Sequence, residues 1–163
     1  AGTPEHVSFR VEDRGGWEEH IRPHLLAVDR RRYNLESYRR VRDLAAREGR
    51  AFCWHGIAPF EQIHPMCGHE TMLMAMALDP DWVADMVMTY ADFTIMHLET
   101  LFQEGGLPDF VWFYEDMGFK EKPFMSPAMY EELVQPGHRR LFDYAHSRLH
   151  EFLIHGRGHE GHV

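Results

Sequence analysis

The stretch of sequence that decides the fold is FVWFYEDMGF, residues 110–119. Its first five residues are apolar or aromatic, a composition typical of a strand buried in a parallel sheet. Two adjacent carboxylates, Glu115 and Asp116, follow directly and lead into Met117 and Gly118, which signal a turn. Parallel α/β folds place their chemistry at the carboxyl ends of their strands, so this stretch predicts both a strand and a candidate site.

Two other segments repeat the pattern of an apolar run followed by ionisable groups. Residues 51–57, AFCWHGI, form a short apolar run that we expect to end as a strand at His55. Residues 151–154 form another, which we expect to end at His155. If the three strands are parallel, their polar ends lie along one edge of the sheet. The sequence therefore predicts that His55, His155 and the Glu-Asp pair converge there.

Helical patterns separate the three predicted strands. Capping signals support them: Asp79-Pro80 and Ser126-Pro127 each combine a capping side chain with proline at the first helical position. The expected helices span residues 35–46, 69–78, 80–104 and 136–149, with a short one after Ser126. This alternation of helices and strands predicts βαβ units and a parallel sheet, an α/β fold.

The amino-terminal segment has a different pattern. Residues 7–11, VSFRV, alternate apolar and polar side chains, and Gly15-Gly16 signals a turn before residues 17–21. We expect these two stretches to pair as an N-terminal hairpin. Further on, Arg30, Arg31 and Arg32 begin a basic patch, which fits either a solvated helix face or the recruitment of an anionic substrate.

Composition limits the class of protein. A chain of 163 residues with 44% hydrophobic residues fits one domain with a substantial core, spanning residues 1–163. Its net charge of -9 does not favour nucleic acid or an anionic membrane as a partner. We see no apolar run of ~18 residues and no signal peptide, and the two cysteines cannot form a disulfide framework. We therefore expect a cytoplasmic protein.

Several motifs occur together in an order that resembles the uroporphyrinogen decarboxylase family. They are APFEQIHPMCGHE, DPDWVADM, YEDMGF, PFMSPAMYEELVQPGHRRLFDYAHS and FLIHGRG, and they cover roughly residues 50–158. Residues 116–147 are the most specific part, with an acidic strand end, an SP-x-x-[FY] motif and a helix begun by proline. The family includes decarboxylases of uroporphyrinogen and related methyltransferases that use zinc and a corrinoid.

The resemblance implies a (β/α)8 barrel, of which this chain provides the middle portion. Such a barrel needs ~250 residues, and here about three βα units are visible. The amino-terminal arginine segment that binds substrate carboxylates in the decarboxylases has no counterpart. The chain is then a fragment, a degenerate relative, or one copy of a homo-oligomer that completes the barrel, and we expect a homo-oligomer.

Five residues are predicted to act on an acidic small-molecule substrate. Asp116 and His55 are the candidate catalytic groups, and Glu61, His155 and Arg157 are the candidate substrate contacts. A carboxylate at the mouth of an apolar pocket can hold a cationic intermediate, and a histidine can donate a proton. Asp116 could instead form an Asx turn, His55 could bond a neighbouring loop, and Glu61 could cap a helix. We expect Glu115 to be solvated or paired with Lys120 or Lys122.

Metal binding is not expected. The resembling methyltransferases bind zinc with a His-x-Cys pair, and this chain has His155-Gly156-Arg157 at that place, with a fixed cation in the position of the thiolate. His64, Cys67 and His69 lie close in sequence but match no common zinc spacing. The sequence thus predicts a decarboxylase-like protein without a cofactor. A zinc- and corrinoid-dependent methyltransferase and a non-catalytic barrel fragment or assembly module remain as alternatives.

Overall fold

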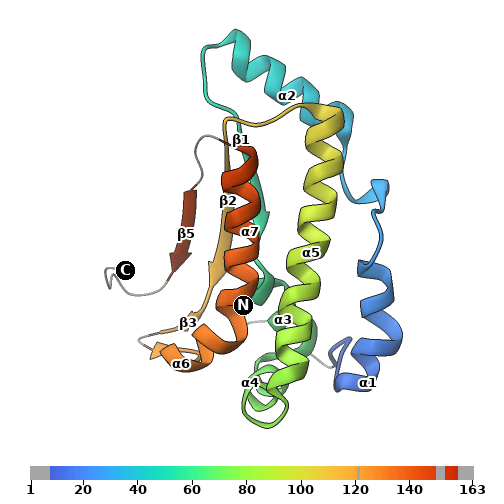
Figure 1. Cartoon of the computed structure of the whole chain (residues 1–163), viewed down its shortest axis with the longest axis vertical. Helices are drawn as coiled ribbons and strands as arrows, with labels where there is room; N and C mark the ends of the chain where they lie inside the picture. Colours follow the sequence, from blue (N-terminus) through green and yellow to red (C-terminus); the bar gives the residue numbers. More distant parts are fainter. Residues whose placement is uncertain (1–7, 121, 150–152, 158–163) are drawn as a thin grey trace, which may run out of the picture.

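Three parallel strands form the centre of the structure. A computed structural model describes residues 8–120, 122–149 and 153–157. The strands lie in the order β1-β2-β5, with β2 in the middle (Figure 1). Their bounds are β1 (Cys53–Ile57), β2 (Phe110–Asp116) and β5 (Leu153–Arg157). Both pairings are parallel, which confirms the α/β class predicted from the alternation of elements.

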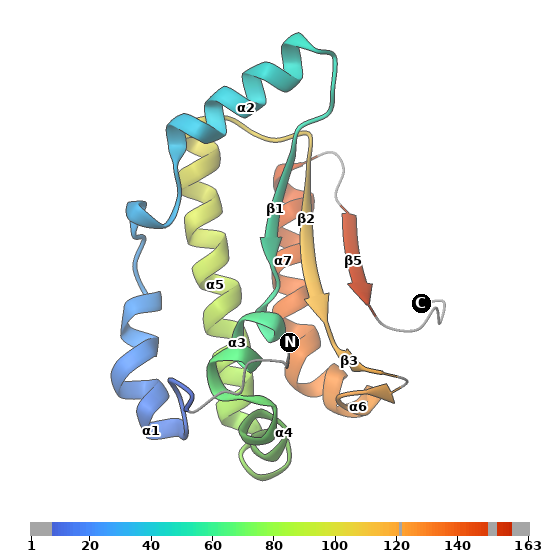
Figure 2. The same ribbon diagram turned by 180° about the vertical axis from the view of Figure 1, so that it is seen from behind.

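The helices occupy long connections between these strands. Figures 1 and 2 show α5 and α7 on the same side of the sheet. The longer helices are α2 (Leu35–Arg47), α3 (Pro59–Cys67), α4 (His69–Leu78), α5 (Pro80–Gly105) and α7 (Gln135–Arg148). The shorter elements are α1 (Arg14–Gly16), α6 (Pro127–Met129), 3-10 turns at Arg22–Leu25 and Arg30–Arg32, and a small antiparallel pair, β3 (Gly118–Phe119) with β4 (Lys122–Pro123).

The predicted helix starts are confirmed by their caps. The Asp79 side chain accepts from Trp82 N at the start of α5, and Ser126 Oγ accepts from Met129 N at 3.2 Å at the start of α6. Each bond satisfies one of the amide groups that a helix leaves unpaired at its amino end. Gly106, with φ of 87°, terminates α5 in a conformation that glycine adopts without strain.

Two π-helical segments precede prolines. Tyr130–Val134 joins α6 to α7, and its bond from Gln135 N to Tyr130 O comes one residue before Pro136. The segment Trp17–Ile21 ends in the same way before Pro23. Proline has no amide hydrogen and its ring crowds the preceding turn, so the wider π turn lets the helical path continue. The two helices expected around Pro136 are therefore one helical run.

Alternate residues of β2 face the helices. Val111, Phe113 and Glu115 are buried, whereas the residues between them are half-buried. Phe113 is part of a core cluster with Leu98 of α5 and Leu141 of α7. Strand side chains alternate between faces, so this burial pattern identifies the side of the sheet on which the helices pack.

The predicted N-terminal hairpin is wrong. The described residues 8–11 form no strand, and residues 14–25 form helical turns instead. Asp13 Oδ1 accepts from Gly16 N at 2.8 Å and starts the first turn. Trp17 is fully buried, and its indole donates to Asp85 of α5 at 2.7 Å. Burial of one large side chain against α5 therefore outweighs a short alternating pattern.

The described residues do not form a closed barrel. Their three parallel strands leave β1 and β5 as edge strands of the sheet. Within the same residues, no helix is both long enough and apolar enough to cross a lipid bilayer.

Candidate functional site

The two carboxylates at the end of β2 have different environments. Glu115 is 2% exposed and lies on the helix side of the sheet, whereas Asp116 is half-buried. They are neighbours in a strand, so their side chains project to opposite faces. Of the two acids at the end of β2, only Glu115 therefore shares the face of Phe113.

Glu115 binds the amino end of α3. Its carboxylate oxygens accept from Glu61 N at 2.6 Å and from Phe60 N at 3.2 Å. Helix α3 has no capping side chain of its own, so Glu115 satisfies two of its unpaired amide groups and places a negative charge at the positive end of the helix dipole. The expectation that Glu115 is solvated or pairs with Lys120 or Lys122 is therefore wrong.

Glu115 is also the first member of a buried chain of side chains. His138 Nε2 lies 2.5 Å from Glu115 Oε2, and His138 Nδ1 lies 3.1 Å from the Tyr130 hydroxyl. Burial raises the pKa of Tyr130, and the charge of Glu115 acts in the same direction. Tyr130 therefore keeps its proton. In a neutral imidazole, Nδ1 then accepts from Tyr130 and Nε2 donates to Glu115.

Neither His138 nor Tyr130 was predicted as a site residue. Tyr130 is the aromatic residue of the SP-x-x-[FY] motif, which is the signal that could have identified it. His138 follows Pro136 and Gly137 without a distinguishing spacing, so its role becomes visible only when α7 is placed against β2.

Four ionisable side chains gather beyond the end of the sheet, and we call Glu61, His64, His69 and Asp116 the edge cluster. Glu61 Oε2 lies 2.8 Å from His64 Nε2, and the imidazole rings of His64 and His69 are 4.7 Å apart. Desolvation lowers the pKa of His69, as does His64, while the charges of Glu61 and Asp116 act in the opposite direction. The charge of Asp116 therefore acts on His69.

An aromatic side chain borders the edge cluster. The ring of Phe124 lies 5.0 Å from that of His69 and 6.3 Å from that of His64. His64 Nδ1 is buried and has no hydrogen-bond partner among the described residues. Burying a polar atom without a partner is costly, and this nitrogen is such an unsatisfied polar atom within the edge cluster.

Asp116 makes the local turn that was considered as its alternative role. Its Oδ1 accepts from Gly118 N at 3.1 Å, and its Oδ2 lies 3.4 Å from the Tyr114 hydroxyl. A carboxylate has about four acceptor positions, so these two bonds leave capacity for a ligand. The Asx turn and a role in binding are thus compatible.

The sheet register shows which predicted residues come together. Asp116 is the Cα partner of Arg157, and Tyr114 is the Cα partner of His155. Both β5 residues therefore occupy register positions near the end of β2. The prediction that this strand ends at His155 is wrong, because β5 continues to Arg157. With Glu61 in the first turn of α3, four of the five predicted residues lie at this end of the sheet. Their roles stay predictions.

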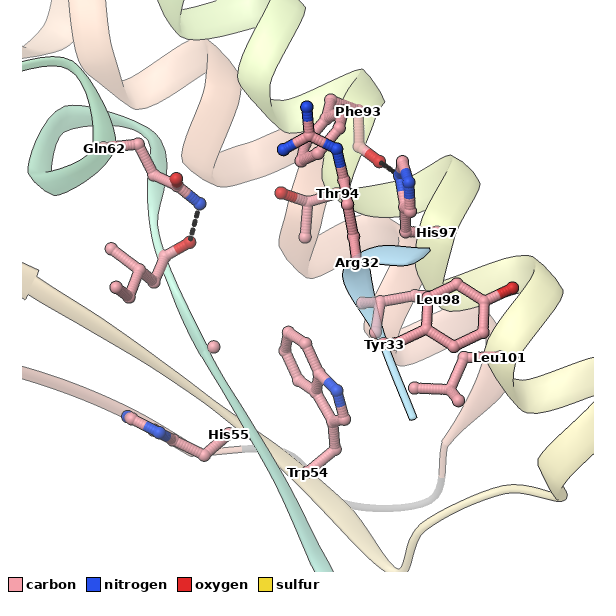
Figure 3. A pocket seen from close by; sticks show the side chains of 12 residues that line it. Arg32, Tyr33, Trp54, His55, Gln62, Phe93, Thr94, His97, Leu98 and Leu101 are labelled. Carbon is pink, nitrogen blue, oxygen red and sulfur yellow. Dashed lines mark hydrogen bonds between the residues drawn. The ribbon is translucent and has the colours of Figure 1, made fainter. Parts of the chain in front are cut away.

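His55 is the exception. It lies inside β1 as the Cα partner of Trp112, so the prediction that it ends a strand is wrong. Asp116 is four residues farther along β2, which at ~3.3 Å per residue corresponds to ~13 Å. In Figure 3, His55 and Trp54 project to opposite sides of the β1 ribbon. His55 is exposed and cannot share a reacting atom with Asp116.

A metal site does not fit these residues. Among the described side chains, no three of His, Cys, Asp or Glu gather closely enough to hold an ion. The spacing of His64, Cys67 and His69 matches no common zinc signature. In addition, Arg157 of this chain stands at the position of the cysteine in the zinc-binding His-x-Cys pair of the related methyltransferases.

Comparison with known proteins agrees with the order of motifs. No curated protein and no solved structure matches this sequence. The family model described as uroporphyrinogen decarboxylase (URO-D) matches residues 19–163, which include α2, all five strands and the edge cluster. The chain therefore belongs to the uroporphyrinogen decarboxylase family.

Proposed function

We propose that the edge cluster is part of the active site of a metal-independent decarboxylase that acts on an acidic, porphyrinogen-like substrate. The observation that carries the proposal is the position of Asp116 at the carboxyl end of the central parallel strand, one residue after Glu115. Because Glu115 binds the first turn of α3, the Glu61-His64 pair lies at the same end of the sheet. Parallel α/β folds bind their ligands at this edge. Membership of the family supports the reaction class.

The proposed reaction replaces a carboxylate on a pyrrole side chain by hydrogen. A proton adds to the pyrrole ring and makes it cationic, and the carbon–carboxylate bond then breaks, releasing CO2 and returning its electron pair to the ring. A second proton completes the methyl group as the first is released. The ionised Asp116 stabilises the cationic ring, because a fixed negative charge near developing positive charge lowers the barrier.

Two other groups complete the proposal. His64 is the candidate proton donor, since Glu61 orients its ring by holding Nε2 at 2.8 Å. Its other nitrogen is buried without a partner among the described residues, so proton transfer requires the ring to move toward the substrate. Arg157 occupies the register position beside Asp116 and would bind a substrate carboxylate, for which its planar guanidinium suits two parallel hydrogen bonds. We rank methyl transfer second, because Arg157 stands at the position of the cysteine in the zinc-binding pair of the related methyltransferases.

Replacement of Asp116 by asparagine tests the proposal. Asparagine keeps an oxygen for the bond from Gly118 N, so the free energy of unfolding should change by less than about 1 kcal/mol. Turnover of uroporphyrinogen, followed by chromatography of the products, should fall by about 10²- to 10³-fold. Glu70→Gln, which removes an exposed carboxylate at the start of α4, should leave turnover unchanged.

Two outcomes would overturn the assignment. Turnover of Asp116→Asn within about twofold of the parent protein would remove Asp116 from the mechanism. Absence of turnover by the unsubstituted protein would refute the proposed reaction itself.

A further inference from the structure

A cavity lies on the other side of α3 from the edge cluster. It has a volume of about 670 Å³ and lies between the amino-terminal segment, the helical turns of residues 17–25, α3 and α5. Its polar lining includes Arg10, His20, His24, Arg32, Gln62 and Tyr90. From α3 it receives Gln62, Pro65 and Met66, whereas Glu61 and His64 belong to the edge cluster. One helix thus separates the two sites.

The lining of this cavity has an unusual charge. The chain has 26 acidic residues against 17 lysines and arginines, yet none of the described residues that line the cavity is Asp or Glu. Arg10 and Arg32 line it together with two histidines. The structure therefore concentrates positive charge in one concave site of an acidic protein, which favours an anionic occupant.

Among the described residues, neither Arg10 nor Arg32 has a carboxylate partner. The neighbouring arginines do: Arg30 pairs with Glu104, and Arg31 lies 2.8 Å from Asp29. Arg32 instead places its guanidinium 4.9 Å from the centre of the Phe93 ring (Figure 3). Stacking uses one face of the guanidinium and leaves its N–H edges able to bind an anion in two parallel hydrogen bonds.

Tyr90 adds a hydrogen-bond donor to the same cavity. Its hydroxyl lies 3.6 Å from Met66 Sδ, a weak acceptor that an anion would readily replace. Burial raises the pKa of Tyr90, and Cys67 acts in the same direction, while Arg32 and Arg10 act against it. Both guanidinium groups are therefore near enough to influence the phenol oxygen.

The apolar part of the site is a smaller adjoining cavity. It has a volume of about 300 Å³ and lies between β1 and α5, and it shares Arg32 and Gln62 with the larger one. Figure 3 shows Trp54, Leu98 and Leu101 around it. Positive charge at the junction and an aromatic, aliphatic wall beyond it are complementary to a molecule with an anionic group and an apolar body.

We propose that the two adjoining cavities form a binding site for an amphipathic organic anion, separate from the edge cluster. A carboxylate or phosphate group binds between Arg10 and Arg32, within reach of Tyr90. The apolar body of the ligand extends past Arg32 toward Trp54. The proposal does not depend on the reaction at Asp116.

The test is titration calorimetry with 2-naphthoate and with its uncharged analogue 2-naphthalenemethanol. If the site recognises the anion, 2-naphthoate binds at least about tenfold more tightly than the alcohol, since one charge-assisted hydrogen bond accounts for about a tenfold difference. Arg32→Gln and Arg10→Gln should each weaken the binding of 2-naphthoate about tenfold without affecting the alcohol to that extent. Inorganic phosphate, tested in parallel, should bind more weakly than 2-naphthoate because it lacks the apolar body.

Arg40→Gln is the matched control, because Arg40 is an exposed arginine of α2 that lines neither cavity. The affinity of the Arg40→Gln variant for 2-naphthoate should equal that of the parent protein. Equal affinity of the unsubstituted protein for the acid and the alcohol would overturn the proposal without reference to any variant. So would equal weakening by Arg40→Gln and Arg32→Gln, which would show that only net charge matters.

Discussion

Replacing Glu115 by glutamine should destabilise the protein strongly although the two side chains have nearly the same shape. The carboxylate accepts from Phe60 N, Glu61 N and His138 Nε2, and its side chain is 3% exposed. A glutamine amide presents one oxygen and one NH2 group, so in either orientation at least one buried N–H loses its acceptor. This costs about 1–3 kcal/mol. Loss of the charge at the amino end of α3 adds about 0.3–1 kcal/mol. The expected decrease in the free energy of unfolding is therefore about 1.3–4 kcal/mol.

Urea denaturation followed by circular dichroism measures this difference. In a protein of this size, a loss of about 1.3–4 kcal/mol also corresponds to a decrease in Tm of about 3–16 °C. Glu131→Gln is the matched control, because Glu131 is an exposed carboxylate in the helical segment next to Tyr130, and its replacement should change stability by no more than about 0.5 kcal/mol. If Glu115→Gln were as mild as this control, Glu115 would not be the cap of α3.

Two further predictions concern buried positions. Gly137→Ala should lower the free energy of unfolding by about 1–3 kcal/mol, because a Cβ atom there would lie 2.5 Å from Val87 Cγ1, where α7 crosses α5. Urea denaturation measures this loss. Recovery of stability in the Val87→Ala background would confirm the cause, whereas unchanged stability of Gly137→Ala would contradict the close packing. In the folded protein at pH 8, the thiol of Cys67 should react slowly with iodoacetamide, since its raised pKa of about 12 keeps it protonated. In denaturant its pKa returns toward ~8.5 and the reaction should be rapid. Mass spectrometry of the alkylated peptide measures both rates, and equal rates would refute the burial of Cys67.

Local signals in the sequence were sufficient to predict most of the elements. Asp79 and Ser126 mark helix starts because the capping bond is made within a few residues of each, and it needs no tertiary contact. The apolar run from Phe110 predicts β2 from composition alone, and the structure buries one face of this strand and half-buries the other. The strand ends were less certain: β1 extends past His55 to Ile57, because hydrogen bonding to β2 and not side-chain polarity decides where it stops.

The candidate site was only partly predictable. Asp116 and Glu61 could be selected as candidates from local signals. Asp116 follows the apolar run of a strand, and Glu61 follows Pro59, which marks a loop or the start of a helix. The partners of Glu115 could not, since Phe60, Glu61 and His138 lie 55, 54 and 23 residues from it along the chain. Contacts at such separations depend on how α3 and α7 pack against β2, and the hydrophobic pattern of each helix does not specify which polar side chain of its neighbour it meets. The same reasoning applies to the cavity of about 670 Å³, because Arg10 and Arg32 come to line one site only in the folded protein.

The alternation of side chains along β2 separates structural and chemical roles between two adjacent acids. Glu115 lies with the core residues, and its charge is fully used by two amide groups and an imidazole. Three of its roughly four acceptor positions are occupied and the residue is buried, so substrate does not reach it. Its contribution to function is to hold the first turn of α3, and hence Glu61, next to the end of β2. Asp116, on the other face, keeps acceptor capacity and partial exposure. It follows that Glu115→Gln should lower stability and thereby the fraction of active protein, whereas Asp116→Asn should lower turnover at constant stability. Exchange of these two signatures would mean that the faces of the strand have been assigned the wrong way round.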